Sequence, residues 1–391
     1  MNGSTRSYEM AKRLVAAGHE VHIFTSCRTG LKAKHGWQKE KIDGINVHWI
    51  HIPYDNTFGF AKRLLAFITF ALRTTARSIS EKGDIVFATS TPLTIAIPAI
   101  IAKKKLRIPL TFEVRDLWPE LPIAIGALRS RILIFFARQL EKWAYKNSDV
   151  LIGLSPGMCD GITKHGIDQS SVHCIPNSCD IEIFQVESDE GTKFRAQHPW
   201  LGDKPLVVYA GTLGVLNGVT YLAEIAKEML TINPDVRFLV VGDGSEKGKI
   251  IARARHLDVL ERNFFMLPPQ PKNQIPALYN AATLVTSLFV PVREMWSNSA
   301  NKFFDGLAAG RPIAINYGGW QTDILKCQKN GIILDPMNHQ KSARLINRTI
   351  GDPVLIDSMG QKSLALAKNR YSRDRMADAL QAALVQASMK T

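Results

Sequence analysis

The chain has 391 residues, of which 46% are hydrophobic and 21% are charged. This length exceeds a single ordinary hydrophobic core and the composition is that of a globular protein, so we expect two domains and exclude disorder. The formal net charge of +14 at pH 7 favours an anionic partner, such as a membrane surface or a nucleic acid.

Cysteine usage and the start of the chain indicate a cytoplasmic protein. No Cys-x-x-Cys pair and no Cys/His cluster occurs, so we expect neither a disulfide framework nor a metal site. No charged segment followed by an apolar one opens the chain, so no secretory signal peptide is expected. The cysteines are Cys27, Cys159, Cys174, Cys179 and Cys327.

The chain enters a helix almost at once. Residues 7–18 have a helical pattern, and Gly18 stands where glycine commonly ends a helix. In a doubly wound fold a central strand normally precedes such a helix, and the sequence contains none. We therefore expect either that roughly fifteen upstream residues, enough for a strand and its turn, are missing, or that the first domain is unusual.

Strand-like segments then alternate with helical ones to the end. This alternation predicts an α/β fold with two Rossmann-like domains, each a doubly wound parallel sheet. Residues 184–200 are the expected linker, which gives domains at 1–184 and 185–360, with helices in 361–391 packing back on the first. The expected strands are 20–25, 45–50, 84–89, 110–114, 150–154, 172–176, 206–210, 236–241, 264–267, 284–288, 312–316 and 332–334.

Two apolar segments raise the question of a membrane. Residues 85–102 carry no charge, but Pro92 and Pro98 interrupt them, so we expect a buried strand followed by a helix. Residues 58–73 combine aromatic, aliphatic and basic residues. That pattern fits equally a helix on an anionic membrane surface and a core helix with a basic edge.

Residues 296–312 are the densest set of candidate site residues. Ser297 or Asn298 is expected to cap a helix that Gly310 ends before Pro312 opens a strand. The N-terminus of this helix would offer free amide donors to an anion such as a diphosphate.

Three polar residues are expected to share one stripe of this helix. Asn298, Lys302 and Asp305 lie at i, i+4 and i+7. A carboxylate in an otherwise apolar helix is costly to bury without a partner. The partner of Asp305 is either a ribose diol, which can donate two hydrogen bonds, or Lys302 on a solvated face.

The segment that begins at Asp305, Asp-Gly-Leu-Ala-Ala-Gly-Arg-Pro, resembles the Glu-Ala-Met-Ala-x-Gly-Lys-Pro segment of the retaining family-four glycosyltransferases. This resemblance implies the GT-B fold, in which two Rossmann-like domains face a central cleft, and implies that Asp305 binds the nucleotide ribose. Ser297 stands where that family usually has a second glutamate on the donor sugar. The Ser-Asn-Ser-x-Asn-Lys version at residues 297–302 is similar to the bacterial N-acetyl-L-fucosamine transferases of O-antigen and capsule assembly.

Further segments match this family in order. The glycine loop at 209–219 would bind the diphosphate, with Lys302 supplying the positive charge. The loop at 241–246 would lie beside the base, and residues 176–180 resemble the family's inter-domain junction. The implied donor-binding residues are Gly3, Gly211, Thr212, Gly214, Gly242, Ser297, Asn298, Ser299, Lys302 and Asp305.

Charged and aromatic residues follow the expected strand at 110–114. Glu113, Arg115, Asp116 and Trp118 come at its carboxyl end, where α/β proteins bind ligands. The resemblance implies that they form the acceptor side, with Asp116 positioning the acceptor hydroxyl. The alternative is a network of Arg115, Asp116 and Glu120 that only holds the loop.

The resemblance implies a retaining sugar transfer in which Asp116 and Lys302 are the catalytic residues. The expected donor is a UDP-sugar, the expected acceptor is a polyprenyl-diphosphate-linked saccharide at the inner membrane face, and no cofactor or metal is expected. The product would belong to O-antigen, capsule or exopolysaccharide. Two alternatives remain, a sugar-nucleotide 2-epimerase of the same fold and a non-catalytic basic nucleic-acid binder, although no nucleic-acid recognition motif is present.

Overall fold

The computed structural model describes residues 5–27, 36–54, 58–90, 92–187 and 189–390, so the predicted donor residue Gly3 lies outside the described residues. The chain divides into two compact units. Unit 1 runs to Pro176 and includes Arg373 onward, and unit 2 runs from Asn177 to Ser372. The first change of unit comes at residue 177, earlier than the predicted boundary at 184. The return to unit 1 comes at residue 373 rather than at 361.

Unit 1 contains two sheets. One has the strand order β1-β3-β2 and the other the order β4-β5-β6-β7. The strands are β1 (His22–Cys27), β2 (Gln38–Ile42), β3 (Ile45–His51), β4 (Val86–Thr89), β5 (Leu110–Val114), β6 (Val150–Gly153) and β7 (Val172–Cys174). The helices are α1 (Thr5–Ala16), α2 (Phe60–Ser80), α3 (Ala96–Leu106), α4 (Glu120–Ala124), α5 (Arg131–Lys146), α6 (Pro156–Thr163) and α16 (Arg373–Ser388), with 3₁₀ turns η1 (Leu93–Ile95) and η2 (Gln169–Ser171).

The sheets of unit 1 differ from the prediction of one parallel sheet. β2 was not expected, and it pairs antiparallel with β3. Its sequence, Gln-Lys-Glu-Lys-Ile, lacks the alternation of apolar and polar residues that indicates a strand. Among the described strands, β1 pairs only with β3 and β4 only with β5, so none of them joins the two sheets.

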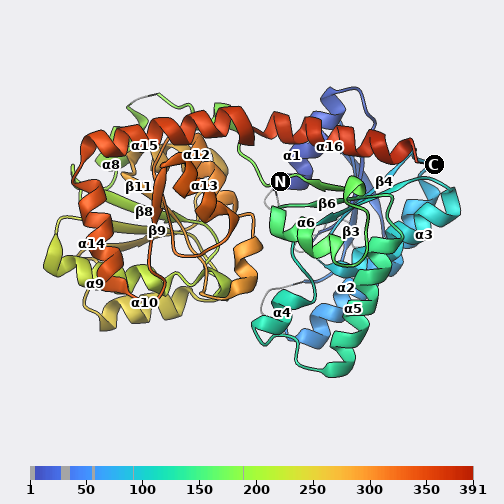
Figure 1. Ribbon diagram of the computed structural model, residues 1–391, viewed down its shortest axis with the longest axis horizontal. Coiled ribbons are helices and arrows are strands. Elements are labelled where there is room, and N and C mark those ends of the chain that lie inside the picture. The colour runs from blue at the N-terminus through green and yellow to red at the C-terminus, as the bar shows by residue number, and fades with distance from the viewer. Residues whose placement is uncertain (1–4, 28–35, 55–57, 91, 188, 391) are drawn as a thin grey trace. The chain divides into compact units, whose positions relative to one another are not determined.

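The last helix completes the core of unit 1. Leu380 and Ala383 of α16 lie in one apolar cluster with Met10 and Leu14 of α1 and with Ile152 of β6. Figure 1 shows α16 running beside α1. Apolar burial of this kind explains why the end of the chain belongs to unit 1.

Unit 2 is built on one parallel sheet with the order β10-β9-β8-β11-β12-β13. Helices cover both of its faces (Figure 1). The strands are β8 (Leu206–Ala210), β9 (Arg237–Val241), β10 (Phe264–Leu267), β11 (Leu284–Ser287), β12 (Ile313–Ile315) and β13 (Gly331–Ile333). The helices are α7 (Ile181–Phe184), α8 (Glu190–Ala196), α9 (Thr220–Ile232), α10 (Lys247–His256), α11 (Ile275–Ala281), α12 (Asn301–Ala308), α13 (Trp320–Gln328), α14 (His339–Ile350) and α15 (Pro353–Leu366), with 3₁₀ turns η3 (Val215–Asn217), η4 (Lys272–Gln274) and η5 (Arg293–Ser297) and a π-helical turn η6 (Ala367–Tyr371).

The predicted linker is wrong, because much of it forms α8. This helix packs on α11, where the Gly191 amide donates to Asn280 Oδ1 at 3.0 Å. A side chain at Gly191 would meet Asn280 at 2.5 Å, so glycine permits the close approach. The segment therefore belongs to unit 2 and does not connect the units.

The uncharged segment at 85–102 forms β4, η1 and the first part of α3. Ala96, Ala99 and Ile100 of α3 are buried in the core. This confirms the predicted order of a strand followed by a helix, but β4 itself is only partly buried, with Ala88 as its one buried residue. Within the described ranges, no helix has the combination of length and apolar character that crossing a membrane requires.

Candidate functional site

The glycine loops after β8 and β9 lie at the carboxyl edge of the unit 2 sheet, where α/β proteins bind ligands. The Gly211 amide donates to the Val241 carbonyl at 2.9 Å. A Cβ at Gly242 would lie 2.0 Å from the Gly211 carbonyl oxygen, and φ at Gly242 is 154°. Because only glycine permits this contact, the two loops pack backbone against backbone. A ligand at this edge would meet main-chain groups.

The side chain of Lys302 lies directly on the first of these loops. A Cβ at Gly211 would be 2.5 Å from Lys302 Cε. The ammonium lies 5.1 Å from the centre of the Tyr209 ring. Burial lowers the pKa of Lys302 to about 8, and the negative charge of Asp305 opposes this shift. A half-buried ammonium gains stability from an anion that binds beside it, so this position suits a diphosphate.

The helix that carries Lys302 begins later than predicted. Ala300 is the N-cap of α12 and makes no side-chain cap bond, so the prediction of a cap at Ser297 or Asn298 is wrong. η5 ends at Ser297, and Asn298 has an extended backbone. The predicted stripe therefore reduces to Lys302 and Asp305, which lie at i and i+3 of the helix.

The start of α12 is suited to an anion. Its first amides lack intrahelical partners, as at every helix start, and the positive end of the helix dipole lies there. Asp305 is half-buried one turn further on. Burial and the charge of Asp305 both raise the pKa of Tyr279. Asp305 therefore acts electrostatically on both Lys302 and Tyr279.

Ser299 joins α12 to the first residues of unit 2. Its hydroxyl accepts from the Asn177 amide at 3.0 Å, and its carbonyl accepts from Asn177 Nδ2 at 2.5 Å. The buried Asp180 pairs with Lys272 at 3.0 Å. The Asn298 carbonyl accepts from Trp320 Nε1 at 2.8 Å. These contacts give Ser299 and the Asn298 main chain a role in holding the loop before α12.

The remaining predicted donor residues lie in the loop after β8. Thr212 is exposed, and its carbonyl accepts from the Tyr209 hydroxyl at 2.8 Å. Gly214 precedes the turn η3, and its carbonyl accepts from the Asn217 amide at 3.0 Å. The fold thus brings Gly211 and Gly242 together with Lys302.

In unit 1, Glu113 lies at the carboxyl end of β5 but is only 1% exposed. Arg6 Nε donates to Glu113 Oε1 at 2.9 Å, and the Thr89 hydroxyl donates to Oε2 at 2.7 Å. Burial alone would raise the pKa of Glu113, but the charge of Arg6 and the hydrogen bonds from Arg6 and Thr89 outweigh it and lower the pKa. The Glu113 carboxylate is therefore bonded inside the protein and is not exposed to a sugar acceptor.

The other predicted acceptor residues follow β5. The Arg115 amide donates to Ser90 Oγ at 2.9 Å, which ties the loop to the end of β4. Asp116 is half-buried, and Trp118 packs against the core around β5. Glu120 pairs with Arg138 at 3.3 Å. The Arg115 amide and the Trp118 side chain thus hold this loop against the protein, and Asp116 between them is partly exposed.

Two family models match the chain, one after the other. The glycosyl transferase 4-like domain matches residues 3–178, and the glycosyl transferases group 1 domain matches residues 190–370. Together they cover most of both units. The chain belongs to the GT-B glycosyltransferases.

In the aligned regions, about a quarter of the residues of two curated relatives are identical to those of this glycosyltransferase. It is 27% identical over 221 residues to a D-inositol 3-phosphate glycosyltransferase of Segniliparus rotundus, a match that covers 55% of the chain and 47% of the relative, about half its length. It is 24% identical over 382 residues to a glycogen synthase of Mycobacterium tuberculosis, which covers 94% and 86% of the two chains.

Solved structures share its fold. HepE of Anabaena in complex with UDP has a TM-score of 0.67 at 18% identity, covering 88% of this chain and 87% of HepE. WaaG, a glycosyltransferase involved in lipopolysaccharide biosynthesis, has a TM-score of 0.71 at 15% identity, covering 96% and 95%.

Sequence reasoning missed Arg6 in this glycosyltransferase. Arg6 is 2% exposed, and besides Glu113 it contacts the carbonyls of Pro176 at 2.6 Å and Ile175 at 2.8 Å. A signal was present, because Arg6 shares the stripe i, i+4, i+8 with two buried apolar residues of α1. A charge within a buried stripe indicates an interior ion pair.

Proposed function

We propose that this glycosyltransferase moves a sugar from a UDP-sugar, with retention at the anomeric carbon, to a lipid-linked saccharide. The observation that carries the proposal is the position of Lys302. Its ammonium lies on Gly211, at the edge of the sheet where the glycine loops after β8 and β9 meet. A half-buried cation beside the start of a helix suits a diphosphate.

The residues around this point have distinct proposed roles. The glycine loops and Lys302 bind the diphosphate, and Asp305 accepts hydrogen bonds from the ribose diol. The solved structure of HepE contains UDP, which supports the choice of nucleotide. No cofactor or metal takes part in this proposal.

The chemistry follows from where charge develops. As the bond from the anomeric carbon to the diphosphate breaks, negative charge builds on the leaving oxygen, and Lys302 with the loop amides stabilises it. The leaving diphosphate takes the proton of the acceptor hydroxyl on the same face of the sugar, so configuration is retained. Asp116 positions that hydroxyl.

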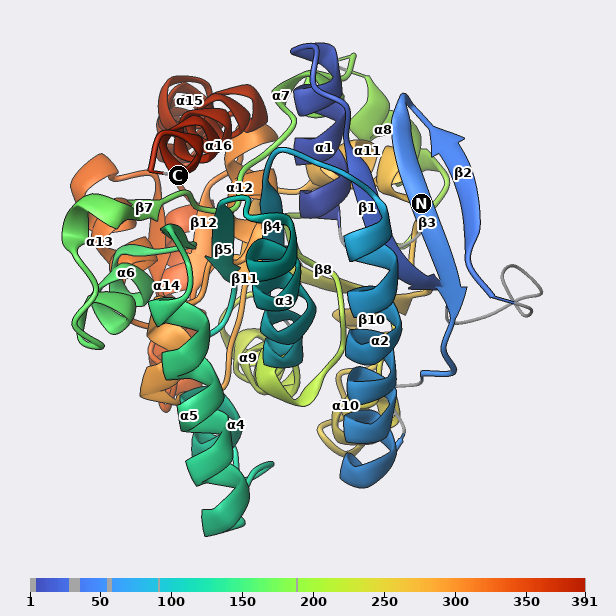
Figure 2. The same cartoon turned by 90° about the vertical axis from the view of Figure 1, so that its right-hand side faces the viewer.

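The lipid-linked acceptor is proposed from the surface of unit 1. The first half of α5 exposes Ile132, Phe135 and Phe136, and α2 exposes Leu65 and Leu72, all at more than half of their full area. Figure 2 shows these two helices extending in the same direction from unit 1. Exposed apolar side chains beside basic ones suit an anionic bilayer surface, such as the inner face of the cytoplasmic membrane.

The pathway proposed is the assembly of O-antigen, capsule or exopolysaccharide, with N-acetyl-L-fucosamine or a similar amino sugar as the group transferred. The sequence at 297–302 supports this sugar. The role of WaaG in lipopolysaccharide biosynthesis supports the pathway.

A transfer assay with candidate UDP-sugars and polyprenyl-diphosphate-linked acceptors tests the proposal. We expect product only when both substrates are present, with the donor's anomeric configuration kept in the NMR spectrum of the product. Inverted product would contradict retention. Release of UDP that needs no acceptor, with a free epimerised sugar, would instead identify an epimerase.

A further inference from the structure

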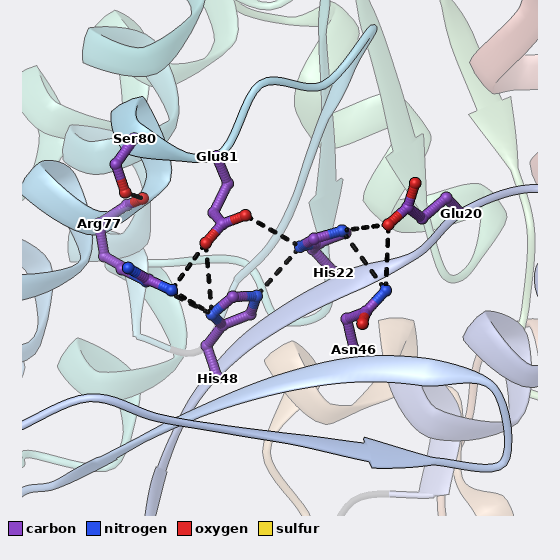
Figure 3. Close-up of polar contacts among 7 residues, drawn as sticks. All are labelled: Glu20, His22, Asn46, His48, Arg77, Ser80 and Glu81. Carbon is purple, nitrogen blue, oxygen red and sulfur yellow. Dashed lines mark hydrogen bonds and ion pairs between the residues drawn. The ribbon is translucent and has the colours of Figure 1, made fainter.

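Two histidines and a glutamate meet on one face of the β1-β3-β2 sheet. β1 and β3 pair in parallel, with His22 opposite Asn46 and Phe24 opposite His48. Because alternate residues of a strand share a face, His22 and His48 lie on the same face of the sheet, offset by two residues along the strands. Glu81 is the C-cap of α2 and approaches the same face. Figure 3 shows all three side chains pointing toward one another.

One ligand atom from each of the three residues lies within 4.8 Å of the other two. His22 Nδ1 is 3.0 Å from His48 Nε2 and 3.6 Å from Glu81 Oε2. Tetrahedral zinc, with bonds of about 2.0–2.1 Å, places its ligand atoms about 3.3 Å apart. An ion at the centre would replace the proton that the two imidazoles share.

The surroundings of His22 match the outer shell of a metal ligand. Its second ring nitrogen, Nε2, lies 3.0 Å from Glu20 Oε1, and Asn46 Nδ2 donates to the same oxygen at 3.3 Å. Metal-bound histidines usually donate their other ring N–H to a carboxylate in this way, which fixes the tautomer and ring orientation.

We propose that His22, His48 and Glu81 bind a divalent transition-metal ion of the zinc class, which ties the end of α2 to the sheet. His48 is fully buried, whereas the side chains of His22 and Glu81 are 22% and 25% exposed. The exposed side gives the ion an entry path and leaves a position for water as the fourth ligand.

Arg77 competes with the ion in the conformation described. Its guanidinium lies 2.7 Å from Glu81 Oε1 and 3.2 Å from His48 Nδ1. Because it is attached by a long side chain and is 31% exposed, it can turn toward solvent when the ion binds.

The sequence predicted no metal site, because the three ligands come from separate segments with no recognisable spacing. Only the pairing of β1 with β3 and the position where α2 ends bring them together.

The test is a titration of the metal-free full chain with Zn²⁺ by calorimetry and with Co²⁺ by visible absorption. We expect one site per chain and the absorption of four-coordinate Co²⁺. His22→Gln and Glu81→Gln should each weaken binding by more than the roughly 10- to 100-fold that loss of an outer-shell partner costs. His19→Gln, a change of an exposed histidine three residues away, is the matched control.

Two further measurements separate this site from a hydrogen-bonded network without an ion. Zn²⁺ should raise the melting temperature of the wild type but not of His22→Gln. Arg77→Gln should bind Zn²⁺ more tightly than the wild type. Absence of saturable binding, or binding that His22→Gln and Glu81→Gln leave unchanged in folded proteins, overturns the proposal.

Discussion

Asp305 and Lys302 are the residues on which the proposed donor site depends. Replacing Asp305 with alanine should weaken UDP binding by about 1.5–3 kcal/mol, because a charge-assisted hydrogen bond to the ribose is lost. Asp323→Ala, which removes an exposed carboxylate from α13, is the control. Calorimetry with UDP measures both variants. Equal affinity for the wild type and a folded Asp305→Ala variant would remove Asp305 from the site.

Lys302 should make UDP binding depend on pH. The free enzyme holds the ammonium form below a pKa of about 8, which burial has lowered. The diphosphate binds the ammonium form better, so affinity should be constant from pH 7 downward to where the phosphate itself titrates, near about 6, and should fall as pH rises through 8. In Lys302→Met the fall above pH 7 should vanish. The same fall in the variant would assign it to another group.

Glu113, which was predicted on the acceptor side, instead forms a buried ion pair with Arg6. Arg6→Ala should destabilise the protein by about 3–5 kcal/mol, because it leaves a buried carboxylate unpaired. Glu113 has a lowered pKa, so its contribution to stability is present above its unfolded pKa and is lost as pH falls. Urea unfolding near neutral pH measures the effect. A variant with Arg6→Met and Glu113→Leu together should lose less than Arg6→Ala, and an equal loss would argue against the ion pair as the cause.

At the scale of elements, the sequence located most strands but not how they pair. Each of the twelve expected segments overlaps a strand. The strands of the unit 2 sheet were the plainest, because buried strands of parallel sheets are continuous apolar runs. β2 was not predicted, because it is an edge strand of its sheet and its residues are mostly polar. The separation of β1 from β4 depends on pairing between distant segments, which local pattern does not encode.

The same limit applies to the site. Gly211, Gly242 and Lys302 could be named from motifs, because their roles depend on local turns and on one helix. The start of α12 could not be placed, since Ala300 rather than a capping side chain precedes it. The pairing of Arg6 with Glu113 joins residues 107 positions apart and needed the structure.

The first half of α5 is the element that the sequence analysis overlooked. Replacing Phe135 and Phe136 with serine should reduce sedimentation with anionic vesicles, because two exposed aromatic rings that would enter the interface are lost. Val354→Ser, which changes an exposed apolar residue of unit 2, is the control. Rising salt should release the wild type. Sedimentation with neutral and anionic vesicles to the same extent would contradict an anionic membrane partner.

For the molecule as a whole, family membership and fold establish a glycosyltransferase, and the proposed donor site rests on the contact of Lys302 with Gly211. Gly211→Ala tests that contact, because the added Cβ would lie 2.5 Å from Lys302 Cε and φ there is 145°. The variant changes no charge and leaves Asp305 in place.

Calorimetric titration of the wild type and of Gly211→Ala with UDP, and with ADP and GDP for comparison, is the most direct test of the account. We expect the wild type to bind one UDP per chain, more tightly than ADP or GDP, and the variant to bind UDP much more weakly. If the wild type binds no UDP, or if the folded variant binds it as well as the wild type does, the site proposed at Lys302 and Gly211 is wrong.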